Sequence, residues 1–283
     1  MSKSPVSASE VVDSAQLALL LDIGVEAKPG NVDRDHDLED LTLPQFLAGA
    51  ADSRTGLERA AAGAPLGEAF ERGVKGMVTR TGENTQFGCL LLLTPLVSAA
   101  TQTVLTPAGL RDVLATTTVD DAVNFYRAFD HVDVAVGTPP ASNGPPDVRL
   151  GAAAEQQLRD EEWRLIDIME ASSIDENATE WTTGFKRTFS MAKQMQSMEY
   201  SLTERVRRAF ISRLGMTKDT HILNTHGPKV ATEVRQRAAS LEDDIDQIRE
   251  LDRELVDRNI NPGTTADLTV AATFVALERG MSI

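Results

Sequence analysis

The chain has 283 residues, of which 41% are hydrophobic, and a net charge of −15. It is long enough to bury the core of one large domain, and its hydrophobic fraction is ordinary for a globular protein. The negative charge argues against nucleic acid as a partner, because the phosphate backbone is bound by basic side chains. Only 7 of the 28 basic residues are Lys. Such a composition is typical of halophilic proteins, since high salt weakens the repulsion between surface carboxylates.

No apolar run approaches the roughly 18 residues that a membrane helix needs; the longest surrounds Leu90–Leu93. Met1–Glu10 contains one Lys and no apolar segment, so it does not resemble a secretory signal. We therefore expect a cytoplasmic protein without a membrane partner. Cys89 is the only cysteine and is expected to be a small buried residue.

Apolar residues recur at steps of three and four along most of the chain, which predicts an all-helical fold in a single domain, residues 1–283. The first helix is expected at Ser9–Leu21, capped by Ser7 or Ser9. Helices then follow at Pro44–Ala62, Leu66–Val78, Asn84–Ala100, Thr106–Ala115 and Val119–Phe129. Beyond the middle of the chain they are expected at Leu158–Glu170, Glu176–Gly184, Arg187–Leu214 (with a break between Gln194 and Ser201), Lys229–Asn259 and Thr264–Glu278.

The segment Asn84–Ala100 is apolar on most faces, so it is expected at the centre, with Pro95 kinking or ending it. Gly137–Pro146 is rich in Pro and Gly and is predicted to be an internal loop. Only Val132–Val136 alternates with period two, so we expect no sheet.

Four polar stretches, rich in Gly, Pro, Asn and Asp, lie next to these helices. They are Lys28–Arg34, Thr81–Gly88, Asp219–Gly227 and Asn261–Leu268. The third is predicted to be free of helix, which resumes only at Lys229. Backbone N–H groups and carboxylates at helix ends can bind a phosphate or a metal. Four such stretches in one chain indicate one composite site.

In the first stretch, Pro29-Gly30 ends a helix and forces a turn. Lys28 and Arg34 are bases that suit phosphate groups, and Asp33 lies between them. A turn with a local ion pair is the alternative interpretation.

In the second and fourth stretches the pattern predicts helix starts. Asn84 or Thr85 is expected to cap one helix, leaving N–H groups free for an anion. Thr264 or Thr265 is expected to cap the last helix, with Asp267 in its first turn. Simple capping is the alternative at both places.

The histidines do not form a ligand pattern. The two in the third stretch, His221 and His226, are five residues apart, a poor spacing for one helical face, so a two-histidine metal site is not expected. His36 and His131 are isolated and are expected to be surface or packing residues.

Together the four stretches resemble, in order and spacing, the motifs of the triphosphoribosyl-dephospho-CoA synthase family. Lys28–Arg34 matches the first motif with Ala27 in place of its first Pro, and Asn261–Leu268 matches the last. In the second motif Gln86 and Phe87 replace the family's His and Lys, and the third motif is matched loosely. We regard the chain as a divergent member of haloarchaeal type.

The resemblance implies an enzyme that joins ATP and 3′-dephospho-CoA. A ribose hydroxyl of dephospho-CoA would attack C1′ of the ATP ribose, and adenine would leave, giving the precursor of a prosthetic group. The implied partners are these two small molecules, the implied cofactor is Mg²⁺, and a homodimer is left open. A related ribosyl transferase or hydrolase with another acceptor, or a non-catalytic nucleotide- or CoA-binding protein, are the alternatives.

The candidate site residues follow from these matches. The catalytic candidates are Asp33 and Asp267. The candidate Mg²⁺ ligands are Asp22, Asp33, Asp40 and Asp267. The candidate substrate contacts are Lys28, Gly30, Asn31, Arg34, Asn84, Thr85, Gly88, Asp219, Thr220, Asn261 and Gly263.

Overall fold

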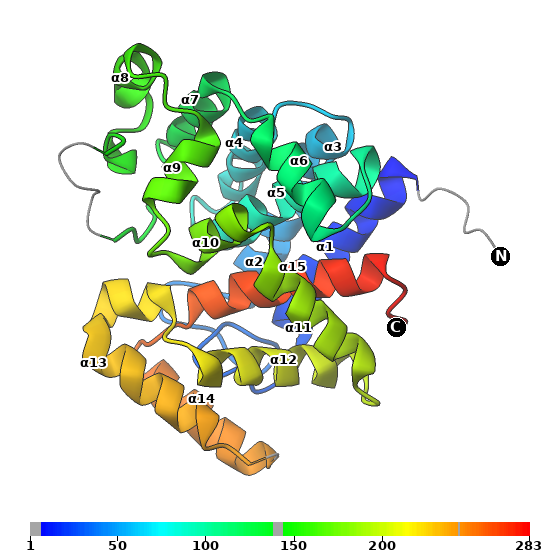
Figure 1. Cartoon of the computed structure of the whole chain (residues 1–283). Coiled ribbons are helices and arrows are strands. Elements are labelled where there is room, and N and C mark those ends of the chain that lie inside the picture. The colour runs from blue at the N-terminus through cyan, green and yellow to red at the C-terminus, as the bar shows by residue number, and fades with distance from the viewer. Residues whose placement is uncertain (1–6, 138–143, 243) are drawn as a thin grey trace.

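The computed structural model describes residues 7–137, 144–242 and 244–283 (Figure 1). Within these ranges it contains helices and connecting segments and no strand, which confirms the predicted all-α fold. The helices of the first half are α1 (Ala8–Gly24), α2 (Leu43–Asp52), α3 (Arg54–Ala61), α4 (Leu66–Val78), α5 (Phe87–Gln102), α6 (Pro107–Ala115) and α7 (Val119–Ala128). Those of the second half are the 3₁₀ helix η1 (Val148–Ala154), α8 (Glu155–Asp160), α9 (Leu165–Ala171), α10 (Glu176–Thr183), α11 (Lys186–Ser197), α12 (Leu202–Met216), α13 (Thr220–Ala239), α14 (Ile245–Asp257) and α15 (Gly263–Glu278).

Helix α15 crosses the middle of the molecule, with α3 to α10 on one side and α12 to α14 on the other (Figure 1). It packs against α1, α5, α11 and α12. Every residue from Thr264 to Ala276 is buried except Asp267. Helix α5 is buried almost as completely, as its apolar sequence predicts, and it continues past Pro95 to Gln102.

Two apolar clusters meet along α15. The larger one draws on helices α1 to α11, on Val206 and Ala209 of α12, and on α15 from Leu268 onward. The smaller one is formed by α12, α13 and α14, together with Ile260 and Ala266. Asp267 therefore lies at the boundary between the two clusters. The prediction of a single domain stays a prediction.

Two predicted helices are each divided because a residue inside them disfavours the helical backbone. Pro44–Ala62 divides at Ser53, whose hydroxyl donates to the carbonyl oxygen of Ala50 (3.2 Å) and competes with the helical hydrogen bonds. Leu158–Glu170 divides near Glu162, whose φ of 56° ends the right-handed helix.

Two more predicted helices divide at local caps. Lys229–Asn259 overlaps both α13 and α14, and the side chain of Asp244 caps the second of them. Arg187–Leu214 divides within the expected interval, where Ser201 caps α12.

The third polar stretch is helical, contrary to expectation. Asp219 Oδ1 accepts the N–H of Ile222 (3.0 Å), so α13 begins at Thr220 rather than near Lys229. The helix is interrupted at Gly227, whose φ of 83° and ψ of 173° are not helical.

The predicted caps of α5 were wrong in position. Gln86 occupies the N-cap of this helix, and Asn84 lies two residues earlier. Asn84 nevertheless accepts the N–H of Phe87 through its side chain (3.2 Å), so it satisfies one free N–H group of the helix.

The predicted cap of α15 was also wrong. This helix begins at Gly263, so Thr264 and Thr265 lie inside it and Asp267 falls in its second turn. The capping carboxylate comes from a distant segment: Asp219 Oδ2 accepts the N–H of Thr265 (2.7 Å).

Part of the predicted loop Gly137–Pro146, residues 138–143, lies outside the described residues. The alternating segment Val132–Val136 forms no strand.

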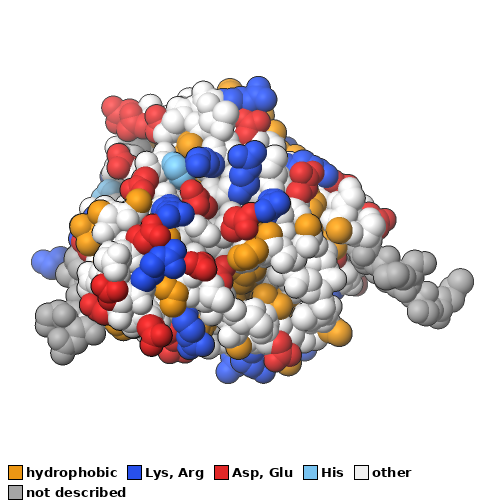
Figure 2. All heavy atoms as spheres, turned by 90° about the horizontal axis from the view of Figure 1, so that it is seen from above, with side chains coloured by type: hydrophobic (Ala, Val, Ile, Leu, Met, Phe, Trp, Pro, Cys, Tyr) orange, Lys and Arg blue, Asp and Glu red, His pale blue; other side chains and the backbone are white. Residues whose placement is uncertain are grey.

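Acidic and basic side chains interleave on the face above α3, α4, α7 and α8 (Figure 2). Arg54 pairs with Glu58 along α3 (2.8 Å), and Arg159 of α8 pairs with Asp120 of α7 (2.7 Å). Such exposed pairs contribute little individually.

No single helix in the described ranges is long and apolar enough to cross a membrane. Only α5 and α6 together reach that length, and they are bent by 104° with respect to each other.

Gly56→Ala should destabilise the crossing of α3 and α4. A Cβ atom at position 56 would lie 2.4 Å from the Cα atom of Gly73 and 2.6 Å from the carbonyl oxygen of Ala69. Because the two backbones would have to separate, we expect the free energy of unfolding to fall by about 1–3 kcal/mol in urea denaturation.

Gly73→Ala is the matched control. Its Cβ atom would meet ordinary contacts at 3.7 Å, and Ala favours a helix over Gly by about 1 kcal/mol. This variant should be neutral or stabilised. Equal destabilisation by both changes would contradict the close crossing.

Candidate active site

The first polar stretch is a tight turn that rests against the residues preceding α15. Ala27 and Gly30 have positive φ angles of 51° and 74°. A Cβ atom on Gly30 would lie 2.3 Å from the carbonyl oxygen of Ile260, so only glycine allows this approach. The first and fourth stretches are thus brought together, as predicted for one composite site.

Lys28 forms a buried ion pair instead of facing solvent. Its Nζ atom lies 2.6 Å from Asp22 Oδ2, and the two residues are 0% and 4% exposed. Burial raises the pKa of Asp22, and the charge of Lys28 opposes that rise. The other oxygen of Asp22 has no hydrogen-bond partner among the described residues. The pair leaves Lys28 without a free charge for a phosphate group.

Asp33 is saturated by donors. Its Oδ2 atom accepts the N–H of Lys28 (2.9 Å), and its Oδ1 atom accepts those of Asp35 (2.8 Å) and His36 (3.2 Å). The ring atom Nδ1 of His36 lies 3.1 Å from the same Oδ1. Burial alone would raise the pKa of Asp33, but these hydrogen bonds outweigh it and hold the pKa below its usual value.

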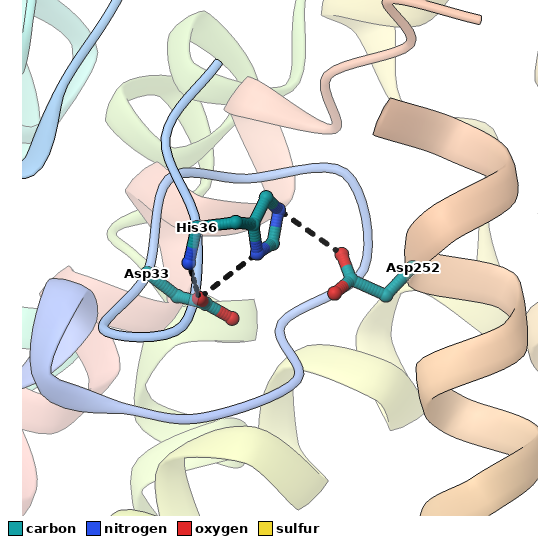
Figure 3. A group of neighbouring side chains, drawn as sticks. All are labelled: Asp33, His36 and Asp252. Carbon is teal, nitrogen blue, oxygen red and sulfur yellow. Dashed lines mark hydrogen bonds and ion pairs between the residues drawn. The ribbon is translucent and has the colours of Figure 1, made fainter. Parts of the chain in front are cut away.

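His36 stands between two carboxylates (Figure 3). Its Nε2 atom lies 3.5 Å from Oδ1 of Asp252, a residue of α14. Potential ligand atoms of Asp33, His36 and Asp252 all lie within 4.8 Å of one another. However, each ring nitrogen faces a different carboxylate, and one ion can use only one of these nitrogens. We therefore describe the group as a clamp of hydrogen bonds and charges.

The Asp33–His36–Asp252 clamp fixes the first stretch to α14. Asp252 also accepts the N–H of Gly30 (2.9 Å). The hydrogen bond to Asp33 is the main cause that raises the pKa of His36, burial opposes it, and the charge of Asp252 adds to it. Burial raises the pKa of Asp252 to about 6.

Asp267 is held between α5 and α10. The Cys89 thiol donates to Oδ1 (3.2 Å), and the Asn177 side-chain amide donates to Oδ2 (2.8 Å). Burial, the largest cause, raises the pKa of Asp267 to about 7, although these two hydrogen bonds lower it. A Cβ atom on Gly88 would lie 1.9 Å from Oδ2, so glycine at this position makes room for the carboxylate.

Asp219 holds the starts of two helices together. It accepts the N–H of Ile222 in α13 and both the N–H and the hydroxyl of Thr265 in α15, the last two at 2.7 Å. Thr220 donates to Asp175, the cap of α10, at 3.0 Å. The N-termini of α10, α13 and α15 therefore share their capping groups.

The charges of Asp22, Lys28 and Asp267 all influence the pKa of the Cys89 thiol. Burial is the main cause that raises the pKa of Cys89 well above its usual value, the charges of Asp267 and Asp22 add to it, and Lys28 opposes it. Asp219 and Asp175 in turn raise the pKa of Asp267. These residues form one region, which we call the carboxylate centre: Asp22, Lys28, Cys89, Asp175, Asn177, Asp219 and Asp267.

The second stretch ends at Gly88, which makes room for Asp267, and Cys89 of the carboxylate centre follows directly. Its predicted phosphate contacts, Asn84 and Thr85, lie against other parts of the chain. Asn84 donates to the backbone oxygen of Asp133 (3.2 Å). Thr85 is buried against Gly49 in α2, where a Cβ atom would lie 2.3 Å from its hydroxyl oxygen.

The remaining predicted site residues are more scattered. Arg34 is half-exposed and pairs with Glu26 (2.6 Å), and Asp40 is exposed, with no hydrogen bond or ion pair to another candidate in the described ranges. Asn31 and Asn261 each have a buried side-chain atom without a partner among the described residues. Gly263 lies beside the ring of His221.

Sequence reasoning missed several of these residues. Asn177 and Asp252 lie inside helices, outside the four stretches, and no local pattern marks them. His36 was expected to be a surface or packing residue, yet it faces two carboxylates. Its position two residues after the first stretch was the available signal.

The structure is that of an all-helical protein in which buried acidic side chains gather at the starts of α10, α13 and α15. The model of the ATP:dephospho-CoA triphosphoribosyl transferase family matches residues 8–282, so the chain belongs to this family. The chain is accordingly a transferase enzyme of the triphosphoribosyl-dephospho-CoA synthase type, and the resemblance stated from the sequence is confirmed.

A solved structure supports this assignment. The chain is similar to a crystal structure from Archaeoglobus fulgidus described as a "putative triphosphoribosyl-dephospho-coA synthase", with 25% identity and a TM-score of 0.70. The similarity covers 85% of this chain and 100% of the other. No curated protein matches the sequence.

His36→Asn should remove a pH-dependent part of the stability. Because the folded-state pKa of His36 is raised, its charge stabilises the fold fully below the unfolded-state pKa of about 6.5. This contribution is lost as the pH rises through the folded-state pKa. We expect the variant to be less stable by about 1–3 kcal/mol at pH 5.5 and closer to the wild type at alkaline pH.

Urea denaturation at a series of pH values measures this difference. His131→Asn is the matched control, because His131 faces the single carboxylate of Glu71 (3.3 Å) outside the clamp. A difference between His36→Asn and the wild type that stays constant with pH would contradict a charged clamp.

Proposed function

We propose that this chain transfers the triphosphoribosyl group of ATP to the ribose hydroxyl of a dephospho-CoA acceptor, with Asp267 as the base. The observation that carries the proposal is the burial and the raised pKa of this carboxyl group. It is half-buried in an otherwise buried helix, and its pKa of about 7 suits proton transfer near neutral pH.

Asp267 has the weakest hydrogen-bond donors among the acids of the carboxylate centre. Asp219 accepts three short hydrogen bonds, and Asp22 is neutralised by Lys28. Asp267 has one amide donor and one thiol, and thiols are weak donors. It therefore keeps the capacity to take a proton from a substrate hydroxyl.

The chemistry follows from this placement. The acceptor hydroxyl forms a bond to C1′ of the ATP ribose as the bond to adenine breaks; adenine leaves with the bonding electron pair and takes up a proton from water. Asp267 receives the hydroxyl proton, and its negative charge, before that transfer, favours the positive charge that develops at C1′. Cys89 and Asn177 orient the carboxylate, and Asp33 positions the first stretch through its clamp.

The four predicted Mg²⁺ ligands do not form one protein-built site. Asp22 is paired with Lys28, the oxygens of Asp33 are filled by N–H groups, and Asp40 is exposed. We propose instead that Mg²⁺ arrives with ATP as a metal–triphosphate complex, the usual state of this small cation with nucleotides.

The acidic composition bears on the salt concentration in which the protein works. We propose that the protein works in a cytoplasm of high salt concentration, given its net charge of −15 and its content of only 7 Lys.

Asp267→Asn should lower kcat for adenine release by about 10²–10⁴-fold, because an amide cannot accept the proton.

In the wild type, kcat should rise with pH through about 7, since the base must be ionised. Asn177→Leu should move this rise to higher pH, because Asn177 lowers the pKa of Asp267.

The assay is adenine release, followed by chromatography, from MgATP and dephospho-CoA in high-salt buffer. Asp160→Asn, an exposed carboxylate on α8, is the control and should leave kcat unchanged. Adenine release that needs no acceptor would show a hydrolase. ATP binding without adenine release would favour a non-catalytic binding protein.

Mg²⁺ should be required with the nucleotide and not bind the protein alone. We expect EDTA to abolish adenine release, and excess Mg²⁺ to restore it. Calorimetric titration of the protein with MgCl₂ in the absence of ATP should show no tight site. Sub-micromolar Mg²⁺ binding to the free protein would refute the metal–triphosphate complex as the route of entry.

A further inference from the structure

The start of α15 has one narrow accessible strip. From Thr264 to Ala276, Asp267 is the only residue that is not buried, and Gly263, the first residue of the helix, is also partly accessible. Residues four apart lie on the same face of a helix, about one turn from each other. Gly263 and Asp267 therefore share the face of α15 that a substrate can reach.

The imidazole ring of His221 lies beside this strip. A Cβ atom on Gly263 would be 3.4 Å from Cγ of His221 and 3.6 Å from its Cδ2 atom. The ring thus rests against α15 one turn before Asp267, on the same face. Because His221 belongs to α13, two helices present a histidine and a carboxylate to one accessible region.

The backbone of His221 is fixed, whereas its ring nitrogens are unused. Its N–H donates to Thr264 Oγ1 (3.1 Å), and its carbonyl oxygen accepts the hydroxyl of Thr225 (2.8 Å). Within the described ranges neither ring nitrogen has a hydrogen-bond or ion-pair partner. The residue is half-buried, so part of it is open to solvent. A fixed position with free ring nitrogens suits a contact with a substrate.

The surroundings favour the neutral ring. Burial is the main cause that lowers the pKa of His221; the charges of Asp219 and Asp175 oppose this effect, and that of His226 adds to it. The start of α13 acts in the same direction as burial, because the positive end of a helix dipole disfavours a cation. A neutral imidazole carries one N–H donor and one acceptor nitrogen.

The neighbouring carboxylates indicate which part of a nucleotide this histidine meets. The charges of Asp219 and Asp175 act on the ring, and Asp267 lies one turn away, so a phosphate group beside His221 would be repelled. An uncharged purine meets no such repulsion. In the proposed reaction C1′ of the ribose lies at Asp267, and adenine is bonded to C1′. The base is therefore the part of ATP that we expect beside His221.

We propose that His221 donates a hydrogen bond from its imidazole N–H to a ring nitrogen, N3 or N7, of the leaving adenine. The bond to C1′ breaks with its electron pair on adenine, and N3 and N7 share the negative charge that develops. The hydrogen bond strengthens with that charge, so it stabilises the transition state more than the bound substrate. His221 keeps its own proton, and the proton that free adenine holds comes from water.

The inference rests on the proposed function for the reaction, but the contact with adenine can be tested without turnover. The first test measures the binding of free adenine to the full chain by calorimetry. His221→Leu, which removes the N–H, should weaken binding by about three- to tenfold, and His221→Gln, which keeps an N–H donor, should weaken it less. No binding to the wild type at millimolar adenine, or equal binding to His221→Leu, overturns the contact.

His131→Asn is the matched control. The ring of His131 faces Glu71 (3.3 Å), outside the carboxylate centre. This variant should bind adenine as the wild type does. A loss of affinity in His131→Asn as large as that in His221→Leu would count against a specific contact.

The second test compares ATP with 3-deaza-ATP and 7-deaza-ATP, in each of which a carbon replaces one ring nitrogen. With ATP, His221→Leu should lower kcat for base release by about 10–100-fold. With the analogue that lacks the accepting nitrogen, this loss should almost vanish, since the wild type has no contact left to lose. A loss of equal size with ATP and both analogues overturns the proposal.

Together the tests distinguish failure of the contact from failure of the proposed reaction. Adenine binding that depends on His221, in a chain that releases no base from MgATP and dephospho-CoA, supports the contact and rejects the reaction. Base release with a kcat that His221→Leu leaves unchanged supports the reaction and overturns the role of His221 in it.

Discussion

Asp219 joins two helix starts that lie far apart in the sequence. Its carboxylate accepts hydrogen bonds from Ile222 in α13, where it is the local N-cap, and from Thr265 in α15, so α15 has this capping group only while the start of α13 is in place. Because the carboxylate is almost fully buried, it would be costly without these donors. The placement of Asp267, half a turn beyond Thr265, depends on this connection.

The buried acids of the carboxylate centre, and Asp33 of the neighbouring clamp, are held by different groups. Asp22 has a cation, Asp33 has backbone N–H groups and a histidine, and Asp219 has N–H groups and a hydroxyl. Asp267 has the weakest donors, and they only partly offset the burial that raises its pKa to about 7. The proposed base thus differs from the other carboxylates of this region in the strength of its donors.

Helical content could be predicted from the sequence because the spacing of apolar residues is a local property. Helix starts could be predicted where the cap is local: Ser7 or Ser9 was proposed for α1, and Ser7 forms a capping box with Glu10. The start of α15 could not, because its capping carboxylate lies 46 residues away. A cap supplied by a neighbouring residue can be read from the sequence, whereas a cap supplied by a distant residue requires knowledge of the fold.

The same distinction holds for the site. The four polar stretches indicated a common region, and the first and fourth do meet through Gly30 and Ile260. Asn177 and Asp252 reach the site because α10 and α14 pack against it, so the sequence around them did not predict their contacts. Lys28 looked like a free base because its partner, Asp22, belongs to the preceding helix and comes close only after the turn forms.

The contact between Gly88 and Asp267 has a consequence for how this sequence can vary. A side-chain carbon at position 88 and the carboxylate oxygen of Asp267 would compete for the same volume, at a separation of 1.9 Å. A larger residue at 88 can be accommodated only if the acid at 267 is shortened or displaced. The two positions, 179 residues apart, are therefore free to diverge only as a pair.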